Sequence, residues 1–154
     1  MSKQGELWRA ASQLVAKRKK AVLATADASG MPHITWMNAL ADSTMEEVVT
    51  ITAPTTQKVA NLQLNPQAEW MFASTSLESM VYLSGPTQIV RGEEAKKYWD
   101  AMPGKSQAYF RNFCDLDDHE MFSVLRTKVT RVVYCRPPGY RKTVVHELLH
   151  EKHS

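Results

Sequence analysis

The sequence has 154 residues, which suits a single domain with a sizeable core, and its 44% hydrophobic and 23% charged residues are ordinary for a globular protein. Its formal net charge of +3 favours anionic ligands but is too small to indicate a nucleic-acid-binding protein. Cys114 and Cys135 lack C-x-x-C spacing, and the sequence shows neither a signal peptide nor a long apolar span. We therefore expect a cytoplasmic protein that has no disulfide framework, no membrane anchor and no nucleic-acid partner.

The first half of the chain alternates apolar patterns with turn signals. Leu7, Ala11 and Leu14 recur at helical spacing, which predicts an amphipathic helix over residues 6–19. The basic run 17–20 ends this helix, where cations suit the helix dipole. The run contains no aromatic residue, so it does not indicate a nucleic-acid-binding site. The turn at 27–30 predicts a hairpin. The predicted strands are 21–26, 32–40 and 48–52, followed by a short helix that begins at Thr55 or Thr56 and ends near 64.

The second half continues as strands with two inserted helices. Pro66 ends the preceding helix. Ala68, Trp70 and Phe72 alternate with Glu69, Met71 and Ala73, which predicts a strand with its large rings on one face, toward the core. Gly85-Pro86 inside the long strand 80–90 suggests a bulge or an edge position. The other predicted elements are strands 68–74, 120–128 and 130–136, with helices 93–102 and 106–113. This order predicts a mainly β fold, an antiparallel β-barrel with peripheral helices, in one domain over residues 1–140 with a tail over 141–154.

Hydroxyls and a lysine gather where the third predicted strand passes into the short helix. The first N–H groups of a helix lack intrahelical partners, and the helix dipole favours negative charge there. Thr52, Thr56 and Lys58 could therefore complete an anion site. The alternative is that Thr55 merely caps the helix and Lys58 is solvated.

The C-terminal residues 146–150 match the H-E-x-x-H pattern. On a helix, His146 and His150 would share a face and could bind zinc, with Glu147 as a general base. Only a short segment follows, so no third ligand or substrate cleft is evident, and we interpret this segment as a tail without a metal site.

The order of these features resembles one family. AVLATAD-x-x-G-x-PH is followed by a strand, then TITAPTTQKVANLQLNPQAEWMF, then LSGPTQIVR and a helical YWDAM segment. From Leu7 to Arg136 this order resembles the pyridoxamine-5′-phosphate-oxidase-like family of FMN-binding split β-barrels, closest to its general-stress-protein branch. The resemblance implies a six-stranded antiparallel split barrel that forms a homodimer with FMN at the dimer interface.

The resemblance also implies a set of cofactor-binding residues. The strand lining the isoalloxazine ring would comprise Ile34, Thr35, Trp36, Met37 and Asn38. The residues along the ribityl chain and the phosphate would be Ile51, Thr52 and Ala53. The phosphate would be bound by Thr56, Gln57 and Lys58, and Ser79 and Met80 would contribute from across the interface.

Two departures from the family pattern affect the expected function. Gln57 stands beside the phosphate lysine where many relatives carry arginine, and the segment 136–154 lacks the tryptophan and the Arg-x-His pair of the true oxidases. We therefore expect an FMN-dependent oxidoreductase of unknown small-molecule substrate, not a true pyridoxamine-phosphate oxidase, with no catalytic side chain identified. The alternatives are a non-enzymatic stress-related protein with a weak or empty flavin site, or the same fold binding deazaflavin or haem. His33 could lie over the flavin or cap a sheet face.

Overall fold

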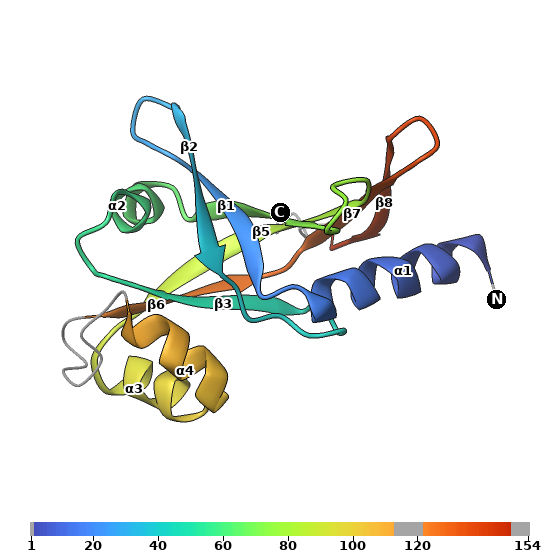
Figure 1. The fold of residues 1–154 in the computed structure, drawn as a ribbon. Coiled ribbons are helices and arrows are strands. Elements are labelled where there is room, and N and C mark those ends of the chain that lie inside the picture. Colours follow the sequence, from blue (N-terminus) through green and yellow to red (C-terminus); the bar gives the residue numbers. More distant parts are fainter. Residues whose placement is uncertain (1, 113–121, 149–154) are drawn as a thin grey trace.

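The chain folds into antiparallel strands with helices at the periphery (Figure 1). A computed structural model describes residues 2–112 and 122–148, with four helices and eight strands in these ranges. The helices are α1 (Lys3–Lys17), α2 (Gln57–Leu64), α3 (Gly92–Asp100) and α4 (Gly104–Arg111). The strands are β1 (Lys20–Ala26), β2 (Pro32–Asn38), β3 (Glu47–Thr52), β4 (Gln67–Ala73), β5 (Met80–Val90), β6 (Ser123–Lys128), β7 (Arg131–Arg136) and β8 (Arg141–Glu147). None of the described helices is both long and apolar enough to cross a membrane.

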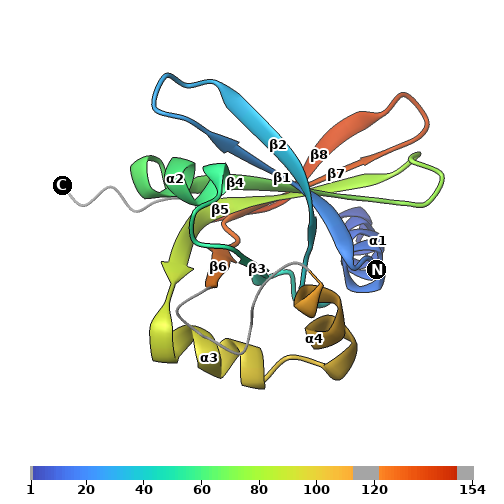
Figure 2. The same ribbon diagram turned by 60° about the vertical axis from the view of Figure 1, so that its left-hand side comes forward.

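The strands form one antiparallel sheet that curls into a half-barrel. The order along it is β2-β1-β4-β5-β6-β3, and β7 pairs with β5 and with β8. A bridge between Leu40 and Val49 joins the segment after β2 to β3, so the two ends of this strand path approach each other. The β1–β2 and β7–β8 hairpins project from the same side of the curled sheet (Figure 2). The mainly β split-barrel prediction is confirmed, with β7 and β8 added to a path of six strands.

Helix α1 begins earlier than the apolar spacing predicted. The Ser2 side chain accepts a hydrogen bond from the Gly5 N–H, and this N-cap starts the helix at Lys3 rather than at residue 6. The helix ends at Lys17, so the basic run 17–20 spans the last residue of α1, the two-residue connection and the first residue of β1.

The prediction of an edge position at Gly85-Pro86 is wrong, because β5 is a central strand. Its first half pairs with β7 as far as Ser84, and its second half pairs with β6 from Thr87 onward. Gly85 lies where the partner changes, and a Cβ atom there would lie 1.9 Å from the carbonyl oxygen of Lys128. The glycine is therefore required by a close approach of two backbones.

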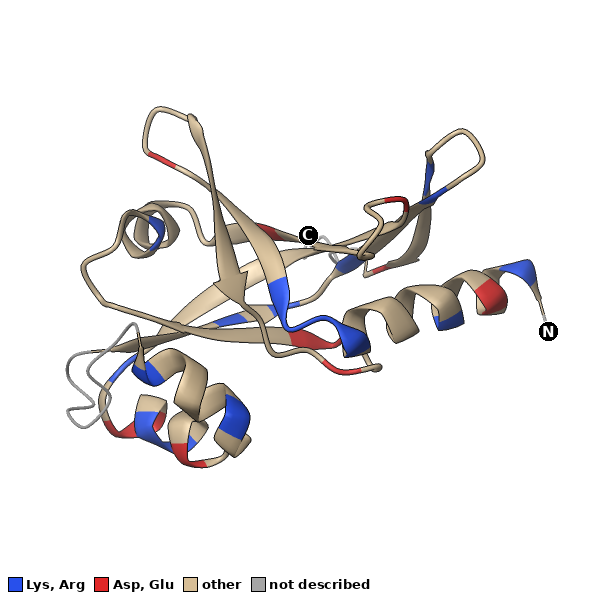
Figure 3. Cartoon of the chain, viewed as in Figure 1, with Lys and Arg blue, Asp and Glu red and all other residues tan. Residues whose placement is uncertain are grey.

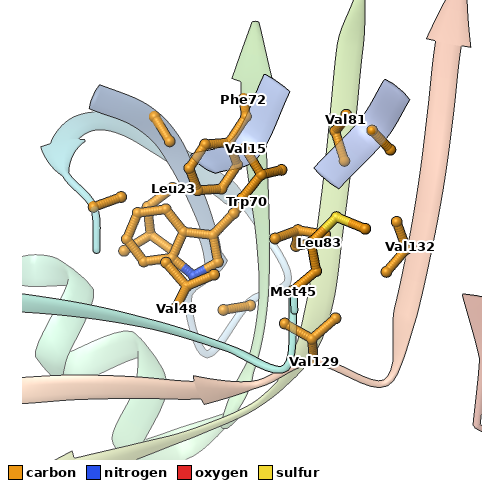
Figure 4. Packing of buried hydrophobic residues seen from close by; sticks show 14 of the residues in the cluster. Val15, Leu23, Met45, Val48, Trp70, Phe72, Val81, Leu83, Val129 and Val132 are labelled. Atoms are coloured by element: carbon orange, nitrogen blue, oxygen red, sulfur yellow. The ribbon is translucent and has the colours of Figure 1, made fainter. Parts of the chain in front are cut away.

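The predicted core residues Trp70 and Phe72 are fully buried, which confirms the alternation of β4. They pack with Val15 of α1 and Leu83 of β5 on the inner face of the sheet (Figure 4). The Trp70 indole Nε1 donates a hydrogen bond of 2.9 Å to the Thr127 hydroxyl, so its one polar atom is satisfied inside the core.

The segment expected as a C-terminal tail contains the strand β8. Residues 141–147 pair with β7, so His146 and Glu147 lie on a strand and not on the helix that a zinc-binding H-E-x-x-H requires. The His146 ring packs edge-on against Trp8 of α1, with 5.8 Å between ring centroids. Within residues 2–112 and 122–148 no cluster of three or more His, Cys, Asp or Glu could hold a metal ion. Cys114 and His150 lie outside these residues.

Candidate cofactor site

Three of the predicted phosphate-site residues meet at the start of α2. The Lys58 Nζ donates to the Thr52 hydroxyl at 3.3 Å, and the Thr52 and Thr56 hydroxyl oxygens lie 3.4 Å apart. Thr52 ends β3 and is buried, so the strand fixes the place to which Lys58 reaches back. The geometry favours a shared polar site over a solvated lysine.

The N-terminus of α2 has no side-chain cap. Thr56 occupies the N-cap position with extended backbone angles, but its hydroxyl donates to the Ala53 carbonyl at 3.2 Å and accepts no bond from the first turn. The first turn also contains no acidic residue. Its N–H groups and the positive end of the helix dipole are therefore not compensated by side chains of the helix, which suits an anion.

Gln57 is engaged in holding the helix in place. Its Nε2 donates to the Asn61 Oδ1 at 2.7 Å, and the Asn61 Nδ2 donates to the Thr25 hydroxyl of β1 at 3.0 Å. Asn61 is 1% exposed, so this polar chain ties α2 to the sheet through a buried amide. Sequence reasoning missed Asn61 and Thr25, and only the i, i+4 spacing of Gln57 and Asn61 hinted at their contact.

The residues predicted to line a flavin ring do not share one face. Side chains alternate along β2, so Ile34 and Trp36 project outward, with exposed fractions of 75% and 64%, whereas Thr35 and Met37 belong to the opposite face. Asn38 is buried, and its carbonyl oxygen accepts a 2.6 Å hydrogen bond from the Thr50 hydroxyl. Ile34 and Trp36 are thus the exposed large apolar side chains of β2.

Met80 lies on the same outer face of the sheet as Trp36. Trp36 lies opposite Val22 of β1, and Val22 lies opposite Met71 of β4. Ala73 lies two residues after Met71, on the same face of β4, and is opposite Met80 of β5. Residues directly opposite each other in antiparallel strands share a face. Ser79 lies in the turn before β5, where its N–H donates to the Ser74 hydroxyl at 3.1 Å.

A family model described as pyridoxamine 5′-phosphate oxidase matches residues 7–136 of the chain. The chain belongs to this family. The match runs from α1 to the end of β7, so it includes the whole path of six strands and the start of α2.

Several solved structures share the fold at low sequence identity. A protein related to general stress protein 26 from Clostridium acetobutylicum is 17% identical with a TM-score of 0.73, and the match covers 93% of this chain and 95% of that one. A haem-binding protein from Mycobacterium smegmatis is 21% identical with a TM-score of 0.72, covering 91% and 57%. An FMN-binding protein related to pyridoxamine 5′-phosphate oxidase from Nostoc punctiforme is 12% identical with a TM-score of 0.62, covering 94% and 96%.

In this member of the pyridoxamine 5′-phosphate oxidase family, His33 contacts the hairpin turn before β2. Its Nε2 lies 2.9 Å from the Asp27 Oδ2. The hydrogen bond from His33 and a second one from the Ser29 hydroxyl lower the pKa of Asp27 far below its ordinary value of 3.8. The Asp27 Oδ1 also accepts hydrogen bonds from the Ser29 and Met31 N–H groups, so this carboxylate organises the turn before β2.

Proposed function

We propose that the chain is an FMN-binding flavoprotein of the oxidoreductase type, with the phosphate of FMN at the start of α2. The observation that carries the proposal is the convergence of Thr52, Thr56 and Lys58 on a helix N-terminus without a side-chain cap. These residues offer one cation, two hydroxyls and backbone N–H groups, which is the donor set that a phosphate monoester needs.

The cofactor would supply the hydride or electron chemistry once bound, and the polypeptide would supply its position and electrostatic surroundings. Lys58 and the helix N-terminus would fix one end of the cofactor, and Thr52 would orient the Lys58 ammonium through their hydrogen bond. Ile51 and Ala53 flank Thr52 and would lie along the ribityl chain, as the family pattern implies. A cytoplasmic location is part of the proposal.

We infer a homodimer in which the outer face of β2 meets a second copy. Ile34 and Trp36 are large apolar side chains exposed on this face, and Val22, Met71 and Met80 extend it across β1, β4 and β5. An exposed apolar patch on a sheet is a typical protein-interaction surface. A dimer would cover Trp36 and bring Ser79 and Met80 of one copy toward a cofactor held by the other, as the family pattern implies.

A weaker or different ligand is the second candidate. The Gln57 amide is bonded to Asn61, so it adds no cation to the site, and the phosphate of FMN would have Lys58 as its charged partner there. The fold is also shared with a haem-binding protein. A non-enzymatic stress-related role, or haem or a deazaflavin on the same barrel, would fit these two observations.

Replacing Lys58 tests the proposed phosphate site. A charge-assisted hydrogen bond contributes about 1.5–3 kcal/mol, so Lys58→Ala should weaken FMN binding by about 10- to 150-fold in a fluorescence titration. Lys105→Ala on α4 is the matched control, because Lys105 also lies in the first turn of a short helix but is exposed, whereas Lys58 is half-buried. Equal FMN affinity in the wild type and in Lys58→Ala would show that the phosphate of FMN does not bind at this site.

A further inference from the structure

A buried hydroxyl at the start of β6 lacks a hydrogen-bond partner. Ser123 is 0% exposed, and its Oγ bonds to no other residue that the structure describes. Other buried hydroxyls of the strands are paired. Thr50 donates to the Asn38 carbonyl at 2.6 Å, and the Thr87 and Thr127 oxygens lie 2.7 Å apart. An unpaired buried hydroxyl is costly, so its presence in a folded protein needs an explanation.

Ser123 lies beside the proposed phosphate site. It is directly opposite Thr52 in the pairing of β3 with β6, so the two side chains share a face, with Cβ atoms about 4.5–5.5 Å apart. Thr52 in turn accepts the hydrogen bond from Lys58, which is the one charged residue of α2. The rest of the α2 ribbon is tan in Figure 3. The unpaired hydroxyl is therefore next to the residue that holds the cation of the site.

The hydroxyl protons at this site all point one way. The Thr56 hydroxyl donates its proton to the Ala53 carbonyl, so toward Thr52 it can only accept. The Thr52 hydroxyl therefore donates to Thr56 while it accepts from Lys58. The Thr52 and Thr56 oxygens are 3.4 Å apart, beyond the range of about 2.5–3.0 Å that O–H···O bonds prefer. This bond is weak, so it can be exchanged for another at little cost.

The Ser123 oxygen is a second possible acceptor for the Thr52 proton. A Cβ separation of about 5 Å allows two cross-strand hydroxyls to form an O–H···O bond of about 2.8 Å once one of them rotates. Transfer of the bond from Thr56 to Ser123 would free Thr56 to face an anion at the start of α2. It would also give Ser123 the partner that it lacks in the ligand-free protein.

We propose that Ser123 is a positioning residue of the anion site, which accepts the Thr52 hydrogen bond when a phosphate group draws Thr56 to itself. Lys58 keeps its bond to Thr52 during this exchange. Because Ser123 is fully buried, it acts through Thr52 and does not touch the ligand. The inference rests on the proposed function only in that a phosphate group binds at the start of α2.

Ser123→Ala tests the exchange, with FMN and inorganic phosphate as separate probes. We expect this variant to bind FMN about 2- to 12-fold more weakly in a fluorescence titration, which corresponds to the loss of one neutral hydrogen bond. It should also bind phosphate more weakly in a calorimetric titration. Without a ligand it should unfold at the temperature of the wild type or above it, because an unpaired hydroxyl has been removed.

Ser106→Ala is the matched control, since Ser106 is also a buried serine but lies on α4, and it should leave both affinities unchanged. Ser123→Ala that binds both probes as tightly as the wild type would overturn the proposal. A ligand-free Ser123→Ala that unfolds at a lower temperature than the wild type would overturn it too, because the hydroxyl would then already be bonded.

A double-mutant cycle with Thr52→Val separates this role from a purely structural one. Valine keeps the shape of the side chain but has no hydroxyl, so Ser123→Ala should have no further effect on FMN affinity in that background. An equal loss of affinity in both backgrounds would contradict the exchange. If Thr52→Val does not fold, Thr56→Val takes its place with the same expectation, because the exchange also needs the Thr56 hydroxyl.

The two probes distinguish the failure of this inference from that of the proposed function. A protein that binds phosphate in a manner sensitive to Ser123 but takes up no FMN keeps the role of Ser123 and loses the flavin. FMN that binds the wild type and Ser123→Ala alike keeps the proposed function and overturns the role of Ser123. A wild-type protein that binds neither probe overturns both.

Discussion

Asn61 is the residue on which the position of α2 depends most directly. It links Gln57 to Thr25 and is 1% exposed, so Asn61→Ala leaves the buried Thr25 hydroxyl without its partner. We expect a loss of about 1–3 kcal/mol in the free energy of unfolding, measured by urea denaturation, together with weaker FMN binding. Gln63→Ala is the control, because Gln63 is exposed on the same helix, and a variant at Asn61 as stable as this control would contradict the role of the link.

Asp27 makes stability depend on pH in the acidic range. Its pKa is lowered in the folded state by hydrogen bonds from His33 and Ser29, so folding favours the ionised carboxyl. A lowered pKa stabilises the fold above the ordinary value of 3.8, and this contribution is lost as the pH falls below it. The difference in unfolding free energy between wild type and Asp27→Asn should therefore shrink below about pH 4. A difference that grows there would show that the carboxyl is not stabilised in this way.

At the scale of elements, Gly85 determines how β5 changes partners. Gly85→Ala would bring a Cβ atom to 1.9 Å from the Lys128 carbonyl oxygen, so the two strands must separate. We expect a loss of about 1–3 kcal/mol in urea unfolding. Gly104→Ala is the matched control, because a Cβ atom there meets nothing within 4 Å and Gly104 begins a helix. Equal stability of the two variants would mean that the crossing tolerates a side chain.

The elements that the sequence predicted are those whose signals are local. The hairpin turn at Asp27 and the alternation around Trp70 lie within a few residues, and the start of α2 gathers Thr52, Thr56 and Lys58 within one short stretch. β8 was missed because it carries charges at Arg141 and Lys142, as solvated edge strands commonly do.

Contacts between distant parts of the chain could not be predicted, for a different reason. The link from Asn61 to Thr25 spans 36 positions in the sequence, and no local pattern records it.

At the scale of the whole molecule, the outer sheet face predicts self-association. Trp36→Lys would place a charge in the proposed interface, so we expect a dimer in the wild type and a monomer in the variant by analytical ultracentrifugation. Leu64→Lys is the control, since Leu64 is 69% exposed but lies on α2 and not on this face. A wild-type protein that is monomeric at all concentrations tested would contradict the dimer.

The central claim is that this family member binds FMN through the start of α2. The most direct measurement is a visible absorption spectrum of the purified protein, with mass spectrometry of the released ligand, followed by an FMN titration. The account predicts a flavin spectrum or saturable FMN uptake that Lys58→Ala weakens. A colourless protein that takes up no added FMN, or one that releases haem or a deazaflavin, would contradict it.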